Sequence, residues 1–237
     1  MEQIQLGDIW VEVELKDIKN VHLSVYPPKG RVRIAAPNRM NLDTIRIYAI
    51  SKLAWIKQQQ KKFQAQVREA PREFLNREGH YYLGSRYLLK VIEHDAPPEI
   101  TVKHKTIEMR VRPYTDMEKR HSLMDEWYRA QLKTLVPPII AKWEKIMGVS
   151  LNEFAIKKMK TKWGTCNREA KRIWLNLELA KKPFQCIEYI VVHEMVHLLE
   201  RNHNDKFIAH MNRFLSEWKD LRNELNKLPV SHRDWGY

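Results

Sequence analysis

The sequence His-Glu-Met-Val-His at residues 193–197 constrains the fold more than any other part of this chain. His193 and His197 are four residues apart, so in an α-helix their imidazoles project from one face, one turn apart. The apolar flanks at residues 190–192 and 198–199 predict that this helix is buried, where imidazoles without partners would be costly. We therefore expect the two histidines to bind one metal ion, with Glu194 beside it as a general base.

A hydrolytic zinc site has three protein ligands and keeps a fourth position open for water. His203 is the preferred third ligand, but it follows His197 by six residues and would point away from the metal on a continuing helix. The helix must therefore end between them, and residues 200–202 supply the stop because Asn202 readily adopts the left-handed conformation. Glu217, on the predicted final helix, is the alternative third ligand.

A second segment of interest is Trp163-Gly164-Thr165-Cys166. Gly164 would allow a substrate backbone or a phosphate to come close, and an edge strand here would pair with an extended peptide. The alternative is a packed turn in which Trp163 and Cys166 belong to the core. We do not expect Cys166 to be a fourth ligand, because a catalytic site keeps one position open.

The charge balance points to anionic partners. The 237 residues include 42 Lys and Arg against 29 Asp and Glu, a formal net charge of +13. Residues 150–182 alone contain nine Lys or Arg and three Glu, a net charge of +6. This stretch is either a solvated basic face or a groove for nucleic acid, nucleotides or an acidic protein, with Trp163 and Trp174 as stacking partners. The chain contains no recognised nucleic-acid-binding motif.

Composition excludes several other classes. None of the seven glycines are spaced to form a P-loop or a G-x-G-x-x-G phosphate cradle. The N-terminus has no signal-peptide pattern, and no apolar run approaches the roughly 18–20 residues of a membrane span. The two cysteines, Cys166 and Cys186, are expected to be reduced thiols. We therefore expect a cytoplasmic protein that does not enter a membrane.

Hydrophobic periodicity predicts an α+β fold. Residues 1–115 form a β-rich region with one long helix, and residues 116–237 form a mainly helical region with a small β-sheet, so we place the domain boundary near residue 115. Period-two alternation predicts strands at residues 8–15, 21–26, 31–35, 80–83, 86–93, 99–103, 106–112, 153–160 and 172–177. No internal repeat is visible.

The predicted helices have recognisable starts and stops. Asn41 caps a helix that runs towards residue 67, and Pro183 opens the helix that carries the His-Glu motif. The pair Pro137-Pro138 predicts a break or kink between a helix at 117–135 and one at 138–147. A single final helix is expected from residue 204 or 205 to 226.

Segments on both sides of the motif are similar to one known family. They are residues 162–166 (Lys-Trp-Gly-Thr-Cys), 175–179 (Leu-Asn-Leu-Glu-Leu), Pro183, 189–197 and 202–207, with upstream segments at 22–25, 30–34, 55–56 and 82–87. This pattern resembles the YgjP-like metallopeptidase family, which is related to the SprT-type zinc proteins. The resemblance implies a zincin-like C-terminal domain that binds Zn²⁺ through His193, His197 and His203 and uses Glu194 as the general base.

Three positions depart from related patterns. Thr165 and Asn204 stand where the family commonly has Ser, and both preserve a hydroxyl or a capping group. Glu200 stands where proteases with the motif H-E-x-x-H-x-x-G-x-x-H have Gly, although the histidine spacing is the same. These changes leave the three histidines and Glu194 in place.

The favoured function is a zinc-dependent hydrolase, most simply a peptidase, in which zinc-bound water is deprotonated by Glu194 and attacks a carbonyl. The relation to SprT-type proteins, some of which act on DNA-bound proteins, suggests proteolysis near nucleic acid. One alternative is a metal-dependent nucleoside triphosphate pyrophosphohydrolase, in which Lys162 and Arg172 neutralise the triphosphate. Another is a nucleic-acid-associated accessory protein with a structural or latent zinc site. Trp163, Gly164, Lys162 and Arg172 are the candidate substrate-binding residues, and the oligomeric state is left open.

Overall fold

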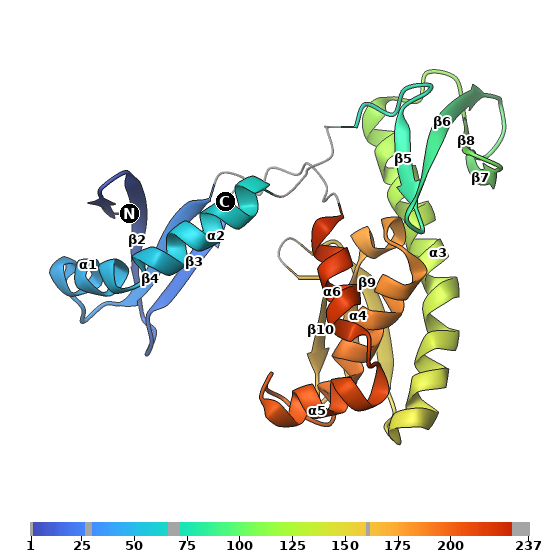
Figure 1. Ribbon diagram of the computed structural model, residues 1–237. Coiled ribbons are helices and arrows are strands. Elements are labelled where there is room, and N and C mark those ends of the chain that lie inside the picture. Colours follow the sequence, from blue (N-terminus) through green and yellow to red (C-terminus); the bar gives the residue numbers. More distant parts are fainter. Residues whose placement is uncertain (1, 27–29, 66–71, 160–161, 229–237) are drawn as a thin grey trace. The chain divides into compact units, whose positions relative to one another are not determined.

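The computed structural model describes residues 2–26, 30–65, 72–159 and 162–228, which form two compact units (Figure 1). The described residues up to 65 belong to the first unit, and residues 72–228 belong to the second. Within these residues the fold is mixed α/β, with three small sheets and six α-helices. None of the described helices combines the length and the apolar composition that a membrane span requires.

The first unit is a four-stranded sheet with two helices. Its strands are β1 (Glu2–Leu6), β2 (Ile9–Lys16), β3 (His22–Tyr26) and β4 (Arg31–Pro37), in the order β1-β2-β4-β3. The strands β2 and β4 are parallel, whereas the two outer pairs are antiparallel. Alternate residues such as Val11, Val13 and Ile34 are buried, as the period-two pattern predicts.

The helix predicted from Asn41 is two helices, α1 (Leu42–Ser51) and α2 (Leu53–Ala65). The side chain of Asn41 caps α1 as predicted, because its Oδ1 accepts a hydrogen bond from the backbone N–H of Thr44 at 2.8 Å. Lys52 separates the two helices. Ile45, Ala49 and Ile56 are fully buried in the same core as the sheet.

The second unit begins with a sheet of the same topology. Its strands are β5 (Gly79–Tyr82), β6 (Ser85–Glu93), β7 (Glu99–Lys103) and β8 (Thr106–Val111), in the order β5-β6-β8-β7. Again the two central strands are parallel and the outer pairs are antiparallel. The chain thus repeats one β-topology, although no repeat is visible in the sequence. A shared Leu-Gly pair marks the first turn of each sheet, with positive φ at Gly7 (63°) and Gly84 (80°).

The helix α3 (Met117–Met147) runs along the second unit, with β5–β8 at its N-terminal end (Figure 1). Of the break or kink predicted at Pro137-Pro138, the break is wrong, because both prolines lie inside this one continuous helix. Val136, Ile139 and Ile140 are buried in the core on either side of them. This burial offsets the lost backbone hydrogen bond, which costs about 3 kcal/mol per proline in an exposed helix.

The rest of the second unit carries the predicted metal-binding helix. The strands β9 (Glu153–Lys157), β10 (Gly164–Asn167) and β11 (Arg172–Asn176) form a sheet in the order β10-β11-β9. A 3-10 turn, η1 (Leu177–Lys181), leads to α4 (Phe184–Val196), which is followed by α5 (Asp205–Phe214) and α6 (Trp218–Lys227). The strand predicted at 153–160 is therefore shorter than expected.

The predicted single final helix is wrong, since α5 and α6 are separate helices. Leu215 leaves the helical conformation, with φ −142° and ψ 80°. Leu215 and Trp218 are both buried in the core on either side of the break. The side chains of Leu215 and Trp218 thus both remain in the core, although the chain leaves the helical conformation at Leu215.

One hydrophobic core joins the second sheet to the helices of its unit. Leu89, Ile107 and Met109 of the sheet belong to the same buried cluster as Leu132 of α3 and Val192 of α4. The boundary predicted near residue 115 lies inside this core. The described residues divide instead between residue 65 and residue 72, because β5–β8 pack with the helices that follow them.

Candidate metal centre

The helix α4 is buried along most of its length, as its apolar sequence predicts. Val191, Val192, Met195 and Val196 are fully buried, so the helix is held in place by the core around it. His193 lies on α4 and is half-buried.

The chain turns sharply after α4. The backbone N–H groups of Leu198 and Leu199 donate to the carbonyls three residues earlier, at 3.0 and 2.9 Å, so the last turn tightens. The helix ends before His203 as predicted, but the predicted left-handed stop at Asn202 is wrong, because no residue from 200 to 202 has a positive φ. Asn204 then caps α5, accepting from the N–H of Phe207 at 3.0 Å.

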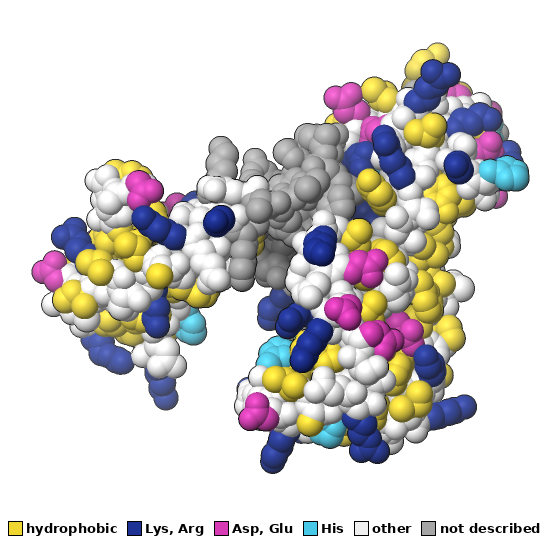
Figure 2. All heavy atoms as spheres, in the orientation of Figure 1, with side chains coloured by type: hydrophobic (Ala, Val, Ile, Leu, Met, Phe, Trp, Pro, Cys, Tyr) yellow, Lys and Arg dark blue, Asp and Glu magenta, His cyan; other side chains and the backbone are white. Residues whose placement is uncertain are grey.

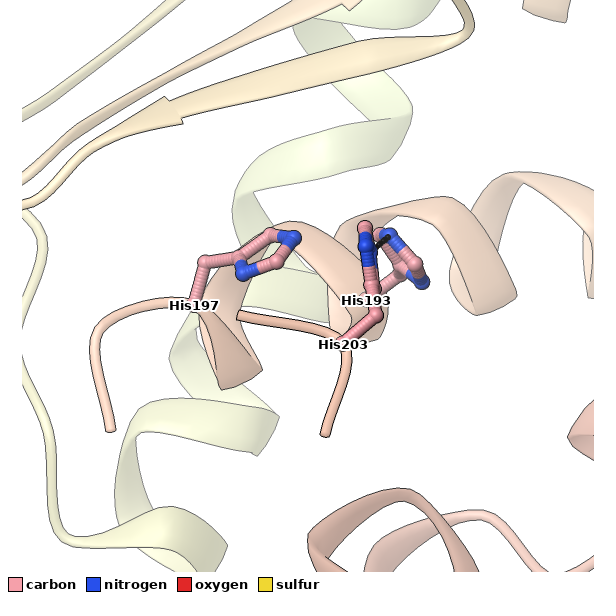
Figure 3. A group of neighbouring side chains, drawn as sticks. All are labelled: His193, His197 and His203. Carbon is pink, nitrogen blue, oxygen red and sulfur yellow. Dashed lines mark hydrogen bonds between the residues drawn. The ribbon is translucent and has the colours of Figure 1, made fainter. Parts of the chain in front are cut away.

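This turn brings His203 back to His193 on α4 and to His197, the C-cap residue that directly follows α4 (Figure 3). One ligand atom from each of His193, His197 and His203 lies within 4.8 Å of the other two. The Nε2 atoms of His193 and His203 are 3.0 Å apart. The Nδ1 atom of His197 lies 3.1 Å from the carbonyl oxygen of Glu200, which leaves its Nε2 free to ligate. The buried ring of Phe207 packs against all three imidazoles, with centroids 4.7–5.0 Å away.

The environment of the cluster favours neutral imidazole, which is the form that binds metals. Burial, followed by the nearby histidines, lowers the pKa of His193 to about 3, and burial also lowers the pKa of His197. The buried Nδ1 of His193 has no hydrogen-bond partner within the described part of the chain.

The donor set fits a divalent metal. A tetrahedral ion with metal–nitrogen distances of about 2.0–2.1 Å would place its ligand nitrogens about 3.3 Å apart. The Nε2 atoms of His193 and His203 are near this spacing, and all three ligand atoms lie within 4.8 Å of one another, so side-chain rotations would bring three nitrogens to one ion.

Glu194 is buried beside the cluster, with only 5% of its surface exposed. Burial raises the pKa of its carboxyl group to about 8, and the positive charge of Lys162 acts in the opposite direction. Gly164 packs directly against this carboxyl group. A Cβ atom at Gly164 would lie 2.6 Å from Oε1 and 2.7 Å from Cγ of Glu194. Only glycine therefore fits at position 164 while Glu194 keeps its conformation. The sequence alone had suggested a different role for Gly164, which was to let the substrate come close.

Other residues considered as ligands lie outside the cluster. Among the described residues, the three histidines form the one group of potential ligands close enough to hold a metal, and Glu217 is not part of it. The Oε2 atom of Glu217 instead accepts a hydrogen bond from the hydroxyl of Ser216 at 2.9 Å. Cys166 is also outside the group, and burial raises the pKa of its thiol to about 11.

A cavity of about 1150 Å³ opens over the histidines and Glu194. Its lining includes all four predicted substrate-binding residues, which are Lys162, Trp163, Gly164 and Arg172. It also includes Arg168, which belongs to the predicted basic stretch, and Arg201 and Tyr189, which the sequence interpretation missed. Arg168 follows the Trp-Gly-Thr-Cys segment by two residues and Arg201 lies between two of the histidines, so their proximity to the motifs was the available signal.

Histidines arranged on and just after an H-E-x-x-H helix define the class of a metallopeptidase-type site. Comparison with known families agrees, since the model of the YgjP-like family, metallopeptidase domain, matches residues 19–228. The chain belongs to this YgjP-like family, which implies a divalent metal and protein or peptide substrates at the level of the family. No match is found among curated proteins.

Two solved structures show partial similarity to the chain. One is the metallopeptidase zymogen abylysin of Pyrococcus abyssi, with 19% identity, a TM-score of 0.35, and coverage of 38% of this chain and 90% of that one. The other is the metallopeptidase zymogen jannalysin of Methanocaldococcus jannaschii. It has 21% identity, a TM-score of 0.32, and coverage of 40% of this chain and 92% of that one.

Proposed function

We propose that this member of the YgjP-like family is a zinc-dependent peptidase with a zincin-like site. His193, His197 and His203 hold the metal, and Glu194 is the general base. The observation that carries the proposal is the convergence of three imidazole nitrogens within 4.8 Å, next to a buried carboxyl group. Three nitrogen ligands with a fourth position open to a cavity are typical of catalytic zinc.

A divalent metal supplies positive charge that polarises a substrate carbonyl, lowers the pKa of a water molecule and favours the carboxylate form of a neighbouring acid. Glu194 accepts a proton from the attacking water at its carboxylate and then donates it to the departing amine. Gly164 keeps space for this carboxylate. The Nδ1–H of His197 donates to the carbonyl of Glu200, which fixes the orientation of that imidazole.

The strand β10 supports an extended peptide as the substrate. It lies at the edge of its sheet and pairs with β11 on one side, with no further strand on its other side among the described residues. Gly164, Thr165 and Cys166 of this strand line the cavity. A peptide added along such an edge gains backbone hydrogen bonds, and its scissile carbonyl would lie over the histidines.

The test compares the wild-type protein with Glu194→Gln. Purified protein is loaded with zinc, its metal content is measured, and hydrolysis of denatured protein is followed. We expect Glu194→Gln to keep one zinc per chain and lose at least about 100-fold in rate, because a general base contributes about 10²–10⁴-fold. The control Glu126→Gln makes the same change at an exposed position on α3, outside the cavity, and keeps the wild-type rate.

The same assay discriminates between substrate classes. Nucleoside triphosphates and a protein bound to DNA are offered in parallel, the latter because the net charge of +13 favours polyanions. Faster hydrolysis of the DNA-bound protein would support proteolysis near nucleic acid. Unchanged hydrolysis by Glu194→Gln would refute the general-base role, and turnover of triphosphate alone would refute the peptidase.

A further inference from the structure

The basic side chains within residues 150–182 and in the turn after α4 include two groups with different surroundings. The first group has partners within the second unit. Three of these cations form ion pairs: Lys158 with Asp125, Lys181 with Glu178 at 2.8 Å, and Arg172 with Glu153 at 3.6 Å. Two others lie over aromatic rings, Lys157 at 3.2 Å from the ring centre of Trp174 and Lys182 at 5.5 Å from that of Trp163. These positive charges already interact with an acidic group or an aromatic ring of the second unit.

The second group faces the cavity. Lys162 and Arg168 line it from the β10 side, and Arg201 lines it from the turn after α4. All three side chains are exposed, and none forms an ion pair with an acidic group in the part of the chain that the structure describes. Figure 2 shows Lys and Arg side chains next to a histidine beside β10. We call Lys162, Arg168 and Arg201 the cationic rim.

The positive charges of the cationic rim lie in the same cavity as the three histidines and Glu194. The lining that contains Lys162, Arg168 and Arg201 also contains His193, Glu194 and His197. A substrate group next to the scissile bond would therefore experience the same positive charge.

We propose that the cavity selects peptides with Asp or Glu beside the scissile bond, whose carboxylates bind the cationic rim. The proposal rests on the proposed peptidase function and names its substrate class. The planar guanidinium groups of Arg168 and Arg201 suit carboxylates, because each can donate two parallel hydrogen bonds to one. Binding over a concave surface shields these pairs from water more than an open surface would.

An acidic peptide fits the cavity better than a nucleic acid does. Glu169 belongs to the same lining and would repel a continuous phosphate backbone, whereas a peptide can place a neutral side chain there. The aromatic rings are also engaged. Two cations, Lys157 and Arg172, lie 3.2 and 4.6 Å from the ring centre of Trp174. Because they cover the ring, a base cannot stack on it on that side.

The test measures binding separately from cleavage. A labelled peptide with Asp and Glu at its central positions and its Asn and Gln counterpart are titrated by fluorescence anisotropy into zinc-loaded Glu194→Gln protein. We expect the acidic peptide to bind roughly tenfold more tightly at low salt, with the difference shrinking as salt increases. Adding Arg168→Glu and Arg201→Glu together should abolish this difference.

A matched control makes the same charge change outside the cavity. Lys133→Glu reverses an exposed charge on α3 and should keep the preference. Zinc content and circular dichroism of each variant confirm that it is folded. Equal binding of the two peptides, an equal effect of Lys133→Glu, or displacement of the acidic peptide by single-stranded DNA at lower concentration would each overturn the proposal.

Cleavage by the wild-type protein distinguishes this proposal from the function on which it rests. If both peptides are cleaved with equal KM and kcat, the selectivity fails while the peptidase stands. If the acidic peptide binds preferentially and neither peptide is cleaved, the peptidase fails while the selectivity of the cavity stands.

Discussion

The two four-stranded sheets have the same strand order and pairing directions, yet they serve different purposes. The sheet β1–β4 is covered by α1 and α2 and shares a core with them alone among the described residues. The sheet β5–β8 is continuous with the core of α3 and α4. The difference is clearest at their first turns, where Gly7 has open space around it and Gly84 is packed against Pro183.

The turn of the second sheet is attached to the segment that leads into α4. The backbone N–H of Leu83 donates to the carbonyl of Ala180 at 2.9 Å, and that of Gly84 donates to Lys181 at 3.2 Å. The same β-topology therefore supports a separate unit in one place and positions α4 in the other. What connects the second sheet to the site is therefore its contact with the segment before α4, and not its strand order.

Replacing the two turn glycines should give the largest difference between the sheets. In Gly84→Ala the new Cβ would lie 2.7 Å from Cγ and 3.1 Å from Cα of Pro183, so either the turn or the start of α4 must move. We expect the second unit to lose about 2–4 kcal/mol, from overpacking and from the positive φ. Alkylation of the buried Cys186 across a urea series reports this loss.

Gly7→Ala is the matched control, because it has a similar positive φ and no neighbour within 4 Å. It should leave the alkylation midpoint of Cys186 unchanged, since Gly7 belongs to the first unit. Equal midpoints for Gly84→Ala and the wild-type protein would show that the turn does not support α4.

Acid should weaken the second sheet through His80, which lies on β5 and is 3% exposed. Burial, with the charges of Arg72 and Lys181, lowers the pKa of His80 to about 3, although Glu78 Oε1 lies 3.1 Å from its Nε2. Below its ordinary pKa of 6.5 the unfolded chain binds a proton that the folded chain does not. Stability should therefore fall by about 1.4 kcal/mol per pH unit between pH 6.5 and the folded pKa.

Urea unfolding at a series of pH values checks this dependence. His80→Gln removes this titrating group and should make the dependence less steep than in the wild-type protein. β1, which occupies the position of β5 in the first sheet, has no histidine, and His22 on β3 is exposed rather than buried. A wild-type slope that His80→Gln leaves intact would assign the acid sensitivity to other groups.

The smallest expected effect is at the contact between α3 and the second sheet. The hydroxyl of Tyr128 donates to the carbonyl of Tyr81 at 2.6 Å, a bond between α3 and β5. Tyr128→Phe should cost about 1 kcal/mol, as for a typical buried hydrogen bond. Amide hydrogen exchange should then increase in β5 and remain unchanged in β1–β4. Increased exchange in both sheets alike would argue against a local contact.

Much of the site was predictable from the sequence because its determinants are local. The spacing of His193 and His197 predicts a shared helix face, and the need for a third ligand led to His203 and to a helix that ends before it. Asn41 and Asn204 were recognisable caps for the same reason, because each cap depends on a few neighbouring residues.

What was missed depends on contacts that are distant in sequence. Burial of Val136 and Ile139 keeps α3 continuous through two prolines, and no local pattern reports that burial. Gly164 is required by Glu194, thirty residues later, so its role emerges only in three dimensions. The shared topology of the two sheets was hidden because strand pairing does not require similar residues.

If His193, His197 and His203 hold one metal ion, zinc binding should depend on each of these histidines and not on neighbouring residues. We predict one zinc per chain for the wild-type protein, and an affinity at least about 10–100-fold weaker for His203→Ala. His210→Ala, on α5 and stacked on Phe214, and Glu217→Gln should bind as tightly as the wild-type protein. Undiminished binding by His203→Ala, or loss of binding in Glu217→Gln, would contradict the account.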